Sequence, residues 1–100
     1  MVPEVAQRKS EIEALCREFG VLRLELFGSA ATGNFTAESD LDFLVEFTDK
    51  GPGYFNRFFD FMEALERLFG RKVDLVSPSA IRNPVFKASV EESRTLLYAA

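Results

Sequence analysis

Residues 26–43, LFGSAATGNFTAESDLDF, contain two short polar motifs that adjoin apolar runs. Gly28-Ser29 directly follows the apolar pair Leu26-Phe27, so an apolar segment passes at once into a glycine and a hydroxyl. Asp40 and Asp42 are separated by one leucine, and in a strand their side chains leave the same face about 7 Å apart at Cα. Each motif alone has an ordinary explanation, a helix cap for Gly-Ser and a surface turn for the aspartates. Their meaning therefore depends on the segments around them.

Three segments of the chain, residues 21–27, 40–47 and 72–76, alternate between apolar and polar residues, which is the period of a half-buried strand. The faces predicted to be apolar hold Leu22, Leu24 and Leu26, then Leu41, Phe43, Val45 and Phe47, then Val73 and Leu75. The opposite faces hold Arg23 and Glu25, then Asp40, Asp42, Leu44 and Glu46, then Lys72 and Asp74.

Helical segments are predicted around these strands. Apolar residues at helical spacing indicate an amphipathic helix over residues 4–19 and a long apolar helix over residues 54–69. Asn83 before Pro84 is typical of a helix start. Residues 95–99 are predicted to form a last, edge strand.

The order of these elements, α-β-β-α-β-α-β, predicts a single α/β (α+β) domain over residues 1–100, a length that fits one hydrophobic core. Each strand has one apolar and one charged face. Helices are therefore expected to cover the small mixed sheet on one face only. The other face, which carries the carboxylates, is expected to stay open.

The reactive residues limit the chemistry available to this chain. There is no histidine and only one cysteine, Cys16, so the usual zinc sites and histidine-based catalysis are excluded, and Cys16 is expected to be a small core residue. Carboxylates, hydroxyls and lysine remain, a set that suits magnesium. A net charge of −4 argues against stable nucleic-acid binding. No apolar run is long enough for a membrane helix or typical of a secretion signal, so the cytoplasm is the expected location.

Asp40 and Asp42 are candidate metal ligands. Carboxylates so placed can hold two cations about 3.5–4 Å apart, the separation used in two-metal phosphoryl chemistry. Asp74 is the expected third ligand if its strand neighbours theirs. Gly28 lets the backbone approach a ligand closely, and Ser29 offers its hydroxyl and a helix-start N–H to a phosphate.

Taken together, Phe27-Gly28-Ser29, Ser39-Asp40-Leu41-Asp42-Phe43 and Val73-Asp74-Leu75-Val76 resemble the motifs of the minimal nucleotidyltransferase (MNT) family of the polymerase-β-like superfamily. The resemblance covers nearly the whole chain and implies the nucleotidyltransferase (polymerase-β-like palm) fold. It also implies that two Mg²⁺ ions and ATP bind here. The residues implied are Asp40, Asp42 and Asp74 for catalysis and metal binding, and Gly28, Ser29 and Ser39 for nucleotide binding.

The family resemblance also suggests a partner. Many small members pair with a helical HEPN-domain toxin, to which the MNT antitoxin adds AMP. This chain is accordingly expected to transfer AMP from ATP to a hydroxyl, that of a tyrosine, on a HEPN-type partner. Two alternatives remain: a catalytically weak antitoxin that neutralises its partner by complex formation, and nucleotidyl transfer to a small molecule.

One departure from the family concerns the loop after Gly-Ser. Family members commonly carry arginine there, whereas this chain has Ala30, Ala31 and Thr32. Arginine introduced at position 30 or 32 is expected to tighten ATP binding. Lys72 or Arg23 could supply the missing charge, with a solvated surface role as the alternative for either residue.

The helix over residues 54–69 has an apolar face wider than one core contact requires. Its second stripe is predicted to meet a second copy of the chain or a helical partner, whereas the first stripe stays in the core. The alternative is one deep core that buries both stripes. The second stripe uses some of Tyr54, Phe61 and Leu68, and the first contains Phe58, Met62 and Leu65.

Overall fold

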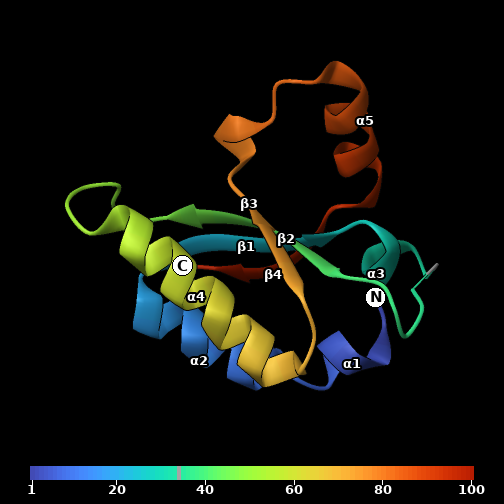
Figure 1. The fold of residues 1–100 in the computed structure, drawn as a ribbon, viewed down its shortest axis with the longest axis horizontal. Helices are drawn as coiled ribbons and strands as arrows, with labels where there is room; N and C mark the ends of the chain where they lie inside the picture. The colour runs from blue at the N-terminus through green and yellow to red at the C-terminus, as the bar shows by residue number, and fades with distance from the viewer. Residues whose placement is uncertain (34) are drawn as a thin grey trace.

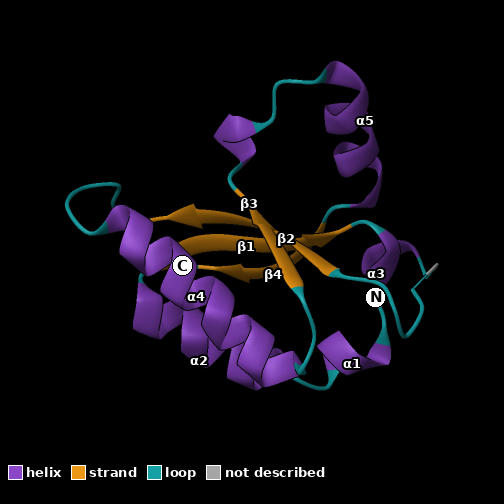
Figure 2. Cartoon of the chain, in the orientation of Figure 1, coloured by secondary structure: helices purple, strands orange, loops and turns teal. Residues whose placement is uncertain are grey.

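A computed structural model describes residues 1–33 and 35–100 and contains a four-stranded sheet in the order β3-β2-β1-β4. Strand β1 (Val21–Phe27) is antiparallel to β2 (Leu41–Phe47) and to the edge strand β4 (Thr95–Ala99). The other edge strand, β3 (Val73–Val76), runs parallel to β2. Figure 2 shows these strands in orange with helices around them. The predicted α/β (α+β) class with a small mixed sheet is confirmed.

Helices α2 (Lys9–Phe19) and α4 (Tyr54–Phe69) lie on the same face of the sheet (Figure 1). The apolar faces of the strands form the main core with them. Within it, the ring of Phe61 lies 5.6 Å from that of Phe19 and 6.0 Å from that of Phe47. Cys16 is fully buried here as expected, and burial raises the pKa of its thiol to about 12.

The opposite face of the sheet is covered at one end by α5 (Pro84–Ser93) (Figure 1). Val90 of this helix packs against Phe27 and Leu44 in a second, smaller apolar cluster. The prediction that helices cover one face only was therefore incomplete. The two apolar residues on the charged face need a cover of their own, because exposed apolar area is costly in water.

The predicted helix over residues 4–19 is divided into α1 (Pro3–Ala6) and α2. At the break, the Arg8 N–H bonds back to the Val5 carbonyl, three residues earlier, at 3.1 Å. The start of α1 is held elsewhere, because the Val2 N–H donates to the Ala30 carbonyl at 3.0 Å. This tertiary contact orients α1 independently of α2.

In β1, Leu22 is 41% exposed and not buried as predicted. The pairing of β1 with β2 shifts register between Val21 and Arg23, and this irregularity turns Leu22 outward. Val21 is buried in its place. Beyond the irregularity, Leu24 and Leu26 are buried as predicted.

Helix α4 exposes other aromatic residues than those predicted. Phe61 and Leu65 are completely buried, whereas Phe55 and Phe59 are 75% and 52% exposed. The buried stripe repeats at positions 54, 58, 61, 65 and 68, the spacing that keeps side chains on one helix face. The prediction that Phe61 meets a partner was therefore wrong, and the prediction that Leu65 lies in the core is confirmed.

The predicted helix start at Asn83 is present. The Asn83 side chain caps α5 by accepting the backbone N–H groups of Val85 at 2.9 Å and Phe86 at 3.3 Å. Short helices α3 (Ser29–Thr32) and η1 (Pro78–Ala80) complete the elements. Among the described residues, no helix is long and apolar enough to cross a membrane.

Candidate active site

Two neighbouring strands bring the predicted aspartates to one area of the sheet. In the parallel pairing of β2 with β3, Asp42 lies opposite Asp74. The Leu41 N–H donates to the Lys72 carbonyl at 3.1 Å, which joins the start of β2 to the residue just before β3. Asp40 precedes Asp42 by two residues, as on one face of an extended chain.

The electrostatics at Asp42 disfavour its ionised form. Burial of the carboxyl group, followed by the nearby charges of Asp74 and Asp40, raises its pKa to about 6. Such a shift arises when a carboxylate loses water and meets like charges. A proton or a bound cation would relieve this repulsion, so the site is suited to binding positive charge.

The two candidate cationic residues differ in their contacts. Lys72 Nζ lies 3.9 Å from Asp40 Oδ2, with both side chains substantially exposed. An exposed pair of this kind contributes little to stability, so the lysine can exchange partners readily. Arg23 Nε instead donates to Glu25 at 3.1 Å. Lys72 is therefore the candidate that stands beside the carboxylates.

Gly28 follows β1 and packs directly against Asp42. Its φ of +76° lies in the region that favours glycine, and a Cβ atom there would collide with Oδ2 of Asp42. Its N–H donates at 3.0 Å to the Oγ of Ser93, which is the last residue of α5. The Gly-Ser turn and the aspartates thus form one packed unit.

Ser29 begins α3 and opens onto a small polar cavity of about 290 Å³ between α3 and α5. The cavity is lined by Gly28, Ser29, Thr32, Ser89, Glu92 and Ser93. Ala30 points inward and is completely buried, whereas Thr32 is exposed. The expectation that arginine at position 30 would aid ATP binding is therefore wrong, because a buried guanidinium would disrupt the core.

Ser39 stabilises the turn that precedes Asp40. Its hydroxyl accepts the Thr36 N–H at 3.0 Å, and its carbonyl accepts Arg71 Nη1 at 2.9 Å. Arg71 Nε also donates to Glu4 at 3.1 Å. These contacts give Ser39 a structural part in the loop, and its nucleotide-binding role stays a prediction.

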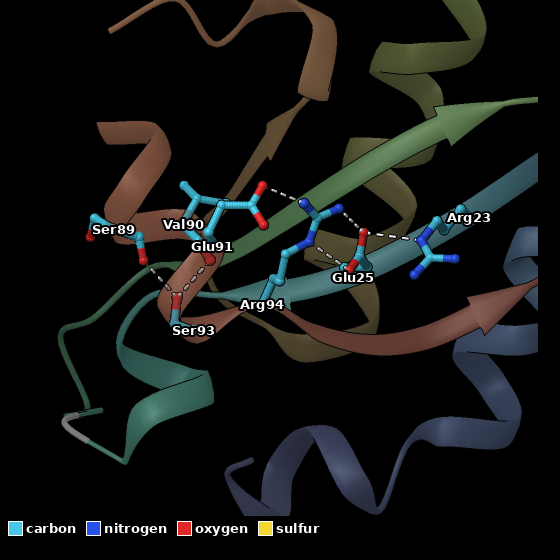
Figure 3. A network of polar contacts seen from close by, with 7 residues as sticks. All are labelled: Arg23, Glu25, Ser89, Val90, Glu91, Ser93 and Arg94. Atoms are coloured by element: carbon cyan, nitrogen blue, oxygen red, sulfur yellow. Dashed lines mark hydrogen bonds and ion pairs between the residues drawn. The ribbon is translucent and has the colours of Figure 1, made fainter. Parts of the chain in front are cut away.

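Sequence reasoning missed a polar network beside this site (Figure 3). Glu25 on β1 is only 4% exposed and accepts two hydrogen bonds from Arg94, at 2.9 and 2.5 Å. The hydrogen-bonded Arg94 guanidinium holds the pKa of Glu25 below its ordinary value. A polar position in an alternating strand predicts exposure, and nothing in the local pattern identifies a partner so distant in sequence.

The three aspartates fit magnesium by chemistry, because carboxylate oxygens are the ligands it prefers. Within residues 1–33 and 35–100, no three acidic or cysteine side chains stand close enough together to hold a metal ion as they lie. Adjacent strands are about 4.8 Å apart, so rotation of the Asp42 and Asp74 side chains is enough to bring their oxygens together.

Known proteins resemble this chain in sequence over most of its length. A model of the family described as "Nucleotidyltransferase domain" matches residues 9–97. A relative from Methanocaldococcus jannaschii, named "Putative protein adenylyltransferase MJ1379", is 37% identical over 91 residues. That alignment covers 91% of this chain and 89% of the relative.

Solved structures resemble the fold. One, named "Structure of putative minimal nucleotidyltransferase", is 31% identical with a TM-score of 0.74, covering 91% of this chain and 90% of the other. A second is the "tri-AMPylated Shewanella oneidensis HEPN toxin in complex with MNT antitoxin". It is 20% identical with a TM-score of 0.65, covering 95% and 72% of the two chains, and shows similarity of fold alone.

Proposed function

This chain belongs to the nucleotidyltransferase domain family, and we propose that it transfers AMP from ATP to a hydroxyl of a helical, HEPN-type toxin for which it is the antitoxin. The observation that carries the proposal is the contact of Gly28 with Asp42, and of Asp42 with Asp74 across two strands. The Gly28-Ser29 turn and an acidic pair thereby lie together, which supports a site for transfer between a triphosphate and a hydroxyl.

Within this proposal the Gly28-Ser29 turn holds the triphosphate, with the Ser29 hydroxyl as donor, and the absence of a Cβ at Gly28 lets the turn lie against Asp42. Asp40, Asp42 and Asp74 would hold two Mg²⁺ ions. When bound, these ions neutralise charge on the phosphate oxygens and favour deprotonation of the attacking hydroxyl.

The reaction is an in-line displacement at the α-phosphorus. The acceptor oxygen forms a bond to that phosphorus, the bond to the β-phosphate oxygen breaks, and pyrophosphate leaves. The hydroxyl proton passes to solvent or to a nearby carboxylate. In the metal-free chain, burial and the charges of Asp74 and Asp40 raise the pKa of Asp42 to about 6, and a bound cation would relieve this repulsion.

A protein acceptor is supported by the surface of the chain. Phe55 and Phe59 are exposed on α4, and aromatic residues of this kind are typical of protein interfaces. The relative is named a "putative protein adenylyltransferase", and the named solved complex contains an AMPylated HEPN toxin. The acceptor side chain we propose is tyrosine.

The direct test is mass spectrometry of a HEPN-type protein from the same genome after incubation with this chain, ATP and Mg²⁺. A mass increase of one AMP group on a tyrosine is expected, and it should vanish with Asp42→Asn or with EDTA. Unmodified HEPN protein, in a mixture where the two chains form a complex, would refute the transfer reaction.

A second candidate function is inhibition by binding alone. It is favoured by the loop after Ser29, which carries no arginine, and by the exposed aromatic residues of α4. The two functions separate in one experiment, because an Asp42→Asn chain would still neutralise its toxin by binding but could not do so by AMP transfer. Toxin activity measured with the wild-type and variant chains, with and without ATP, decides between them.

A further inference from the structure

The junction of α5 with β4 holds the end of β1 at several successive positions. Arg94 bonds to Glu25 at 2.9 Å, Thr95 pairs with Leu26 in the sheet, and Ser93 accepts the Gly28 N–H at 3.0 Å. Figure 3 shows the Ser93 and Arg94 side chains of this junction, with Glu25 beside them. The last of the three contacts reaches the turn that leads into α3.

The Ser93 hydroxyl has a defined orientation. Its oxygen lies 3.4 Å from the carbonyl oxygens of both Ser89 and Val90, to either of which the hydroxyl can donate its single hydrogen. An oxygen lone pair then faces the Gly28 N–H. Ser93 is the last residue of α5, so its side chain links the helix end to the turn.

The helix end that carries Ser93 is itself anchored. Arg94 follows directly and bonds to the buried carboxylate of Glu25 as well as to Glu91 at 2.7 Å. Because Glu25 is 4% exposed, a paired arginine is needed to stabilise its charge. Val90 is buried one turn earlier against Phe27 and Leu44. Ser93 therefore presents its hydroxyl from a fixed position.

On the other side, Gly28 has no free space toward Asp42, since even a Cβ would collide with that carboxylate. Ser93 therefore holds the Gly28 backbone on one side, and the Asp42 carboxylate lies directly against it on the other. We infer that Ser93 is a positioning residue, whose hydroxyl sets the Gly28-Ser29 turn against Asp42 for phosphoryl transfer. The catalytic part of this inference rests on the proposed function.

Three variants test the inference. Ser93→Ala removes the acceptor of the Gly28 N–H, and Ser93→Thr retains a hydroxyl that can still bond to a helix carbonyl. Ser10→Ala is the matched control, because it removes an exposed serine hydroxyl from α2 that does not line the cavity beside Gly28 and Ser29.

Ser93→Ala should lower kcat for AMP transfer by roughly tenfold to a hundredfold, because a small displacement of reacting groups costs rates of that order. KM for ATP should change much less. Ser93→Thr should restore most of the rate, and Ser10→Ala should match the wild-type chain. A purely structural role would instead lower the melting temperature with kcat unchanged, and that result would overturn the inference.

Amide hydrogen exchange at Gly28 gives a readout that does not depend on catalysis. It should accelerate at least about tenfold in Ser93→Ala, because the amide loses its hydrogen-bond partner, and remain slow in Ser10→Ala. If the wild-type chain transfers no AMP, the proposed function fails, while exchange still tests the contact. Unchanged exchange at Gly28 in Ser93→Ala would reject the contact, and with it the positioning role.

Discussion

Replacing Asp42 with asparagine should stabilise the metal-free protein. The carboxyl of Asp42 has its pKa raised to about 6 from 3.8 by burial and by the charges of Asp74 and Asp40. Asparagine keeps the shape of the side chain and removes the charge. The repulsion that raises the pKa then disappears from the folded state.

The size of the effect follows from the shift. Each pKa unit corresponds to about 1.36 kcal/mol, so a shift from 3.8 to about 6 corresponds to about 3 kcal/mol of unfavourable ionisation in the folded state. Asp42 is partly exposed, so solvent screening reduces the expected gain to about 1–2 kcal/mol. For a domain of this size, that gain corresponds to roughly 5–10 °C in melting temperature.

The pH dependence has a definite sign. Below the unfolded pKa of 3.8, Asp42 is protonated in both states and ionisation costs nothing. As pH rises from there through about 6, the unfolded chain ionises more readily than the folded one, so wild-type stability falls relative to the variant. Above that range the difference is constant.

Urea unfolding of the wild-type and Asp42→Asn chains in EDTA, from pH 3.5 to pH 8, measures this difference. Asp60→Asn is the control, since it removes one formal charge from an exposed position on α4. A difference in unfolding free energy that is independent of pH would refute the electrostatic account, as would an asparagine variant less stable at pH 8. Mg²⁺ should then stabilise the wild-type chain, by about 1.4 kcal/mol at ten times Kd, and leave Asp42→Asn unchanged.

Three further predictions concern the loop after Ser29, α4 and the buried ion pair. Thr32→Arg should tighten Mg²⁺-ATP binding by about tenfold in calorimetry, because an exposed guanidinium adds a charge-assisted hydrogen bond to phosphate. Ala30→Arg should unfold the domain, since position 30 is buried. Circular dichroism would reveal this loss of structure. Phe59→Asp should change the melting temperature by no more than a few degrees but should weaken partner binding, as measured in a pull-down assay. Phe61→Asp should lower the free energy of unfolding by at least about 3 kcal/mol and prevent folding. Ionised Glu25 stabilises the folded chain fully above its unfolded pKa of about 4.5. This stability is lost as pH falls through the lower folded pKa of Glu25. Acid unfolding should therefore be steeper for the wild-type chain than for Glu25→Gln.

Local patterns in the sequence were sufficient for the strands and for the acidic positions. Alternation predicted that Leu41 and Phe43 face the core while Asp42 lies between them on the other face, and β2 has this arrangement. The same period failed at Leu22, because an irregularity in pairing depends on the partner strand. The expected roles of the aspartates in metal binding and catalysis stay predictions until the variants are measured.

The amphipathic period of α4 showed that it would bury aromatic residues but could not identify which. Both possible stripes are apolar, and the choice was made by contacts with Phe19 of α2 and Phe47 of β2, which enclose Phe61. Which stripe is buried depends on which other elements pack against the helix, and the sequence of the helix alone does not specify those elements.

By itself, the sequence predicted the strands, the main helices and the acidic face of the sheet, because strand and helix periods act over a few residues. Only the tertiary structure decided that Asp74 stands opposite Asp42 and that Gly28 is held between Asp42 and Ser93. These contacts join residues far apart along the chain, and their geometry is set by how the strands pair and how α5 returns to the end of β1.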